Sequence, residues 1–288
     1  MRIYPYIAFY ISDSFYVDKL IDYDELIKMN DKELLEIVDE IIINFKSTDK
    51  FNIRITRDGM ILLNINELET KMISWNDRIK MPNYTIHNDI KVWNDYIEYL
   101  NAFIIILDSH ITLSNGHSFL EINEITKQDV MRAYYMDVSK NNHKFQGCQG
   151  AFPFSNGMDK YTNFRTPKKE VFVNMTKQNR VISKNILLET IKIFDQCINN
   201  EVLIKILSSL SRSITQYKEG NHETSILFSW FIIESIISNL WDNHLDNINQ
   251  IFDNGKKRIN KDRKKSLINL NIRATCKFKS NQVAGFLL

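Results

Sequence analysis

The run from His222 to Leu245 constrains the fold more than any other part of the chain. It reads HETSILFSWFIIESIISNLWDNHL and places its apolar residues around a central glutamate, Glu234. The run is too long for a strand, and its apolar residues recur at the three- and four-residue intervals of an α-helix. Because these residues cover more than one side of that helix, the pattern predicts a helix buried inside a bundle.

The preceding residues predict two more helices, over Val181–Lys218, with a break at Asn199 and Asn200. Both repeat apolar residues at helical spacing. The stripes consist of Ile182, Ile186, Ile193 and Cys197 in the first helix, and of Leu203, Ile206, Leu207, Leu210 and Ile214 in the second. Together the three helices predict an antiparallel bundle.

The N-terminal part combines strand and helix patterns. Strand-like segments cover residues 3–11, 51–56 and 60–65, and the last two flank Asp58-Gly59, a pair typical of a tight hairpin turn. Helical periodicity covers residues 34–45, with Asn30 and Glu33 as a capping pair, and residues 88–110. Residues 139–167 read as a loop, and 168–175 as a short strand. The predicted fold class is α+β, with a mixed N-terminal domain over 1–177 and a mainly α-helical domain over 178–288.

Three consecutive features of the C-terminal part resemble the front half of a HEPN domain of the Apea-like type. They are a helix ending in SITQYKEGNHE, a helix reading LFSWFIIESIISNLW, and a basic run, KKRINKDRKK, within residues 181–265. Proteins of that family are mostly prokaryotic. Many act as RNases in toxin–antitoxin and antiviral defence systems, or as helical interaction modules beside such enzymes. The resemblance also implies a homodimer, because active HEPN sites form between two copies.

The chain departs from the family where the catalytic residues are expected. Active HEPN domains carry an arginine, four to six intervening residues and then a histidine, on a helix after the basic run. No histidine follows His244, and no arginine has a histidine at that spacing. We therefore expect the sequence to stop before this motif and to contain no catalytic residue. Purified chain is expected not to cleave RNA.

Basic residues gather near the C-terminus. Residues 256–279 hold ten Lys or Arg against Asp262, whereas the first 255 residues hold 27 basic and 34 acidic residues. Such a cluster neutralises phosphates, so its binding to RNA would weaken steeply with salt. The candidate nucleic-acid-binding residues are Lys256, Lys257, Arg258, Lys261, Arg263, Lys264 and Lys265. The alternative is a solvated segment that pairs with the acidic body of the chain.

Glu234 is predicted to have a structural polar role. A carboxylate among Trp230, Phe231 and Ile233 is costly to bury without a partner. It therefore either faces outward or pairs with an arginine. The candidates are Arg212 on the previous predicted helix, and Arg258 and Arg263 after this one.

The sequence contains little that indicates other kinds of catalytic, metal-binding or nucleotide-binding site. It contains no Walker A, GxGxxG or HExxH motif. No metal and no cofactor is expected, because His110, His117 and Glu121 form only a loose set of possible ligands and the three cysteines are far apart. Cys148 is more consistent with a loop thiol than with a nucleophile. Aromatic and basic residues around the 139–167 loop would suit base stacking or would simply anchor the loop.

These patterns predict a cytoplasmic prokaryotic protein of a defence or toxin-type system, with an N-terminal sensing or partner-binding module. No membrane contact is expected, because Glu234 and Asn239 interrupt the longest apolar stretch. RNA, a second copy and a partner protein are the expected partners. Two alternatives belong to other classes: a non-catalytic nucleic-acid-binding or protein-interaction module, and an enzyme that uses the 139–167 loop.

Overall fold

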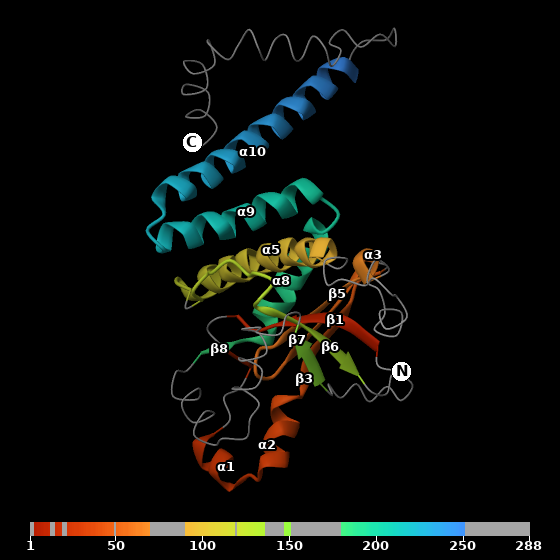
Figure 1. Ribbon diagram of the computed structural model, residues 1–288, viewed down its shortest axis with the longest axis vertical. Coiled ribbons are helices and arrows are strands. Elements are labelled where there is room, and N and C mark those ends of the chain that lie inside the picture. Colours follow the sequence, from red (N-terminus) through yellow and green to blue (C-terminus); the bar gives the residue numbers. More distant parts are fainter. Residues whose placement is uncertain are drawn as a thin grey trace, which may run out of the picture. The chain divides into compact units, whose positions relative to one another are not determined.

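The computed structural model describes residues 3–11, 15–18, 22–48, 50–69, 90–118, 120–135, 147–150 and 180–250 (Figure 1). The chain divides into two compact units, Met1–Ile232 and Ile233–Leu288. The fold class is α+β, as predicted, because an antiparallel sheet precedes several long helices.

A six-stranded sheet lies at the centre of the first unit. Its order is β3-β4-β5-β1-β6-β7, and every neighbouring pair is antiparallel. The strands are β1 (Ile3–Phe9), β3 (Ile41–Lys46), β4 (Phe51–Thr56), β5 (Ile61–Ile65), β6 (Val130–Tyr135) and β7 (Gly147–Gly150). A second, two-stranded sheet pairs β2 (Tyr16–Val17) with β8 (Val181–Ile182) in parallel.

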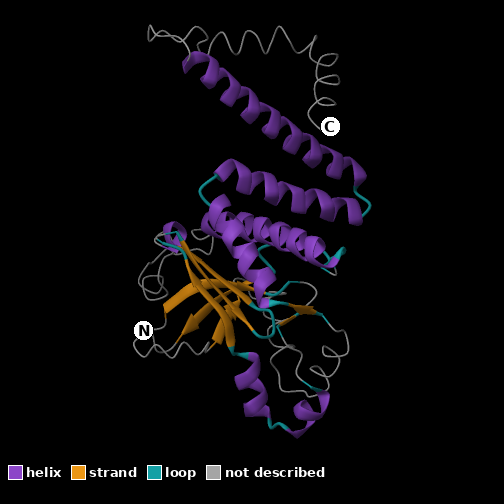
Figure 2. Cartoon of the chain, turned by 180° about the vertical axis from the view of Figure 1, so that it is seen from behind, coloured by secondary structure: helices purple, strands orange, loops and turns teal. Residues whose placement is uncertain are grey.

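Helices cover one face of the large sheet (Figure 2). The described helices are α1 (Tyr23–Lys28), α2 (Asp31–Val38), α3 (Asn66–Glu69), α5 (Ile90–Asn115), α8 (Lys184–Cys197), α9 (Glu201–Lys218) and α10 (His222–Gln250). Helix α5 packs against both α8 and α9. The strands alternate between two buried faces, so that Ile7 and Phe9 face the helices while Tyr6 and Ala8 belong to a separate cluster.

Phe194 of α8 shows how the helices join the sheet. Its ring packs edge-on against Phe51 of β4 and Phe103 of α5, with ring centroids 5.2 and 5.4 Å apart, and all three side chains are fully buried. Leu187 and Ile191 belong to the same core. The predicted domain boundary at residue 177 lies outside the described residues, but elements from both sides of it build this one core.

The helix predicted over residues 34–45 is wrong in its second half. The capping pair is present, because Asn30 Oδ1 accepts from the amides of Lys32 and Glu33 while Glu33 Oε2 accepts from the Asn30 amide. Helix α2 nevertheless ends at Val38, and residues 41–46 form β3. Pairing with β4 sets Ile43 opposite Ile55, which suits the β-branched residues of this stretch.

Other expected elements of the N-terminal part are present. The hairpin of β4 and β5 turns at Gly59, whose φ is +79°. Helix α5 confirms the helix predicted over 88–110 from residue 90 onwards and continues to Asn115. Residues 147–150 were predicted as loop and instead form β7, which pairs with β6. The rest of the 139–167 loop and the strand expected over 168–175 lie outside the described residues.

Candidate interaction surface

Buried polar contacts fix α9 on α5. Asn101 in the middle of α5 is fully buried, and its Oδ1 accepts from the Ile125 amide and from Ser211 Oγ. Its Nδ2 donates to the Ile125 carbonyl. Arg212 Nε on α9 donates to the Glu124 carboxylate at 2.8 Å. These side chains pair donors with acceptors, and they join α5 to α9 and to the segment before β6.

Helix α10 begins against α9 through hydroxyl groups. Ser213 Oγ on α9 lies 3.2 Å from Ser225 Oγ and 2.9 Å from Ser229 Oγ, and Ser225 Oγ donates to the Ser213 carbonyl. Ser213 and Ser225 are both buried. The serine side chains are small, so α10 approaches α9 closely at these positions, and Phe228 and Ile232 on the same side of the helix are half-buried.

The apolar side chains of α10 point to solvent instead. The exposed fractions include 67% for Ile226, 58% for Trp230 and 63% for Leu240. We define the α10 face as the large exposed apolar side chains of this helix: Ile226, Leu227, Trp230, Phe231, Ile233, Ile236, Leu240 and Trp241. The prediction of a helix is confirmed by α10, but the prediction that it is buried is wrong, because most of its large apolar side chains are exposed.

The spacing within the α10 face suits a partner helix. Four residues of this face and the half-buried Ile237 beside them follow one another at intervals of four and three residues, the repeat that aligns apolar side chains along one seam: Ile226, Trp230, Ile233, Ile237 and Leu240. An exposed apolar patch of more than a few hundred Å² marks an interaction site in soluble proteins, and eight large side chains, each at least 42% exposed, make a patch of that order.

Arg212 and Glu234 do not form the pair that was a candidate in the sequence. Arg212 binds Glu124, and Glu234 is exposed. The outward orientation of Glu234 corresponds to the other option for this residue. Its solvated carboxylate needs no cation.

By its length and composition alone, helix α10 is also long and apolar enough to cross a membrane. Residues His222–Asn243 have a mean hydropathy of 1.3 and are 6% buried. A single helix of this kind in the described part of the chain is weak evidence for a membrane span and is compatible with a soluble protein. The serine contacts to α9 occupy one side of this segment.

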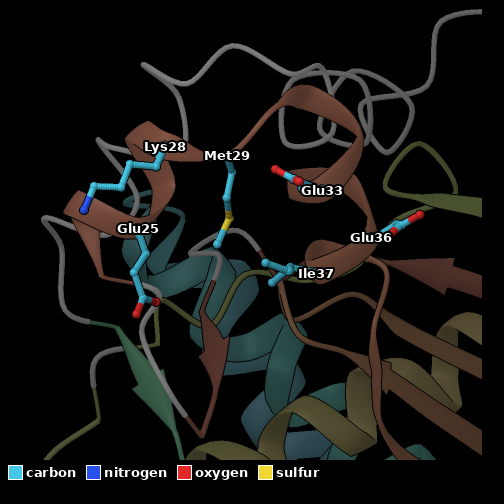
Figure 3. Close-up of a pocket in the computed structure, with 6 residues that line it drawn as sticks. All are labelled: Glu25, Lys28, Met29, Glu33, Glu36 and Ile37. Atoms are coloured by element: carbon cyan, nitrogen blue, oxygen red, sulfur yellow. The ribbon is translucent and has the colours of Figure 1, made fainter.

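A shallow groove of about 510 Å³ lies between α1 and α2 (Figure 3). Met29 and Ile37 form its apolar part, and Glu25, Lys28, Glu33 and Glu36 surround them. These four charged side chains are exposed, and Glu33 already caps α2. The groove therefore gathers no buried reactive group.

The remaining candidate residues give no second site. His110 Nδ1 lies 3.0 Å from the Ile106 carbonyl and 3.3 Å from Thr190 Oγ1, which places it in the contact between α5 and α8. Across the described ranges, no three His, Cys, Asp or Glu residues come together as a metal site. Cys148 lies in β7. The basic residues from Lys256 to Lys265 lie outside the described part of the chain.

Comparison with known proteins adds no assignment: no family model, no curated protein and no solved structure matches this chain.

Proposed function

We propose that this chain is a HEPN-like protein of a prokaryotic defence or toxin-type system that acts in the cytoplasm by binding rather than by cleaving RNA. In this proposal the α10 face holds two copies of the chain together. The proposal rests on the uncovered α10 face, supported by the resemblance of residues 181–265 to the front half of a HEPN domain.

A second copy suits this face in both size and chemistry. Each partner in a stable complex contributes about 800 Å² of surface, and eight large side chains that are half exposed supply area of that order. The seam of Ile226, Trp230, Ile233, Ile237 and Leu240 contains no charged side chain. An apolar seam is self-complementary, as an interface between identical subunits requires.

The test replaces Ile226 and Trp230 together with lysine. Both side chains are more than half exposed, so their replacement should cost the isolated chain little stability, whereas two ammonium groups in a dimer interface would lose hydration. Size-exclusion chromatography with light scattering should show a dimer for the wild type and a monomer for the double variant. The control is Leu113→Lys, 83% exposed at the end of α5, which should remain dimeric.

Two outcomes would contradict the proposal. One is an unchanged mass for the double variant. The other is flotation of the wild-type chain with phosphatidylcholine vesicles, lost in the double variant, which would assign the α10 face to a lipid surface.

A second candidate function is RNA binding by the basic segment 256–279, favoured by its ten basic residues against one acidic residue. Binding of single-stranded RNA should weaken steeply between about 50 and 200 mM salt. It should vanish when Lys256, Lys257, Arg258, Arg263, Lys264 and Lys265 are replaced by glutamine, with the RNA itself left intact. Cleavage of the RNA that is lost on mutating a residue of this chain would contradict the non-catalytic proposal.

A further inference from the structure

The region that carries α1 and α2 is strongly acidic. Residues 22–40 contain eight acidic residues and two lysines, which gives them a formal charge of −6. The acidic residues are Asp22, Asp24, Glu25, Asp31, Glu33, Glu36, Asp39 and Glu40. Glu40 is paired with Arg57, whereas Glu25 and Glu36 are exposed. A region of this charge attracts cationic groups.

The groove between α1 and α2 adds an apolar floor to this charge. Met29 and Ile37 are half-buried, so part of each side chain remains open to contact with a ligand. Figure 3 shows Met29 between Glu25 and Glu33, with Ile37 directed towards its tip, while Lys28 points away from it. Methionine adapts its shape to different partners, which suits a surface that binds a peptide. The groove therefore fits a peptide segment that carries lysine or arginine on either side of an apolar side chain.

The sequence itself contains a segment with this chemistry. Residues 256–279, which we call the basic segment, hold ten basic residues against Asp262, a formal charge of +9. Near its start, Ile259 lies between Arg258 and Lys261. This order of an apolar residue flanked by cations corresponds to Met29 and Ile37 between carboxylates. The groove and the basic segment are thus complementary in charge and in the placement of apolar groups.

We propose that the groove binds the basic segment of a second copy of this chain. This inference rests on the self-association proposed for the α10 face. The basic segment begins shortly after the end of α10 at Gln250, so in such a dimer the segment of each copy begins close to the interface with the other. Each copy supplies one groove and one basic segment, and two copies therefore exchange their segments reciprocally, as the two-fold symmetry of a homodimer requires.

Zero-length cross-linking of the full-length chain tests this contact. A carbodiimide joins a lysine amine to a carboxylate only where the two groups touch. Unlabelled and ¹⁵N-labelled chains are mixed, left to exchange subunits and then cross-linked. At about 0.1 M salt, lysines of residues 256–265 should be linked to Glu25 or Glu33 in peptide pairs of mixed label. At about 1 M salt the yield should fall at least about fivefold, because the screening length shortens from about 10 to about 3 Å.

Three results would overturn the inference. The first is the absence of these links at low salt. The second is links without mixed label, which would mean that the segment binds its own chain. The third is an equal yield of links to Glu201, an exposed carboxylate on α9, because attraction to any acidic side chain would then explain the links to the groove.

Substitutions separate the groove from the rest of the surface. Met29→Arg puts a cation on the floor of the groove and should abolish the links, whereas Leu113→Arg, at the exposed end of α5, should retain them. If Met29→Arg does not fold, Glu25→Gln replaces an exposed side chain instead and should lower the yield of links to Glu33.

These variants leave the α10 face unchanged, so each should keep the molar mass of the dimer. A wild-type dimer without groove links would overturn this inference alone. A wild-type monomer would overturn the proposed self-association as well.

Discussion

Replacement of Gly59 by alanine is expected to destabilise the chain by about 3 kcal/mol or more, through two separate costs. Gly59 has a φ of +79°, in the left-handed region that disfavours a Cβ atom by roughly 1–2 kcal/mol. A Cβ at this position would also lie 2.5 Å from the carbonyl oxygen of Phe15, which is a backbone atom and has to move. Such overpacking typically costs about 1–3 kcal/mol.

Gly220 provides a matched control for this prediction. Its φ is +80°, but apart from its chain neighbours no atom of the described residues lies within 4 Å of a Cβ built on it. Gly220→Ala should therefore show only the conformational cost, roughly 1–2 kcal/mol. Urea unfolding of the two variants measures the difference. Equal losses would mean that the close approach of the Phe15 carbonyl to Gly59 does not add to the cost of the substitution.

Phe194→Ala is expected to cost about 3–5 kcal/mol, because a fully buried aromatic ring is removed from a core that is already closely packed. The ring contacts Phe51 of β4 and Phe103 of α5, so its loss should weaken the sheet and the helices together. Fluorescence and far-UV circular dichroism should report one shared urea transition, shifted to lower urea in the variant.

The control for this second prediction is the preceding residue. Ile193 also lies in α8 but is 36% exposed, and Ile193→Ala should cost clearly less than Phe194→Ala. A small loss in Phe194→Ala, or separate unfolding of strand and helix signals, would support instead an independent N-terminal domain that ends near residue 177.

The sequence correctly predicted the helices and turns that depend on residues close together in the chain. Asp58-Gly59 specifies a hairpin turn because glycine tolerates the positive φ, and Asn30 with Glu33 specifies a helix start because the two residues satisfy each other's backbone groups. The long α5 was visible because its apolar residues recur over many turns, so that a few polar interruptions do not hide the repeat.

The sequence-based predictions were wrong where contacts between distant parts of the chain decide the structure. The stretch Ile41–Lys46 has apolar residues compatible with either a helix or a strand, and only its pairing with β4 decides between them. Strand β7 contains two glycines and acquires its structure from β6. In α10, periodicity revealed the helix but not its orientation, because Ser225 and Ser229, not the apolar residues, meet Ser213.

Sedimentation equilibrium of the wild-type chain over a wide concentration range tests most directly whether the α10 face is an interface between copies. The proposal predicts a molar mass that rises to twice 34.1 kDa with increasing concentration and falls towards 34.1 kDa on dilution. A mass that remains at 34.1 kDa at every concentration would contradict self-association through the α10 face.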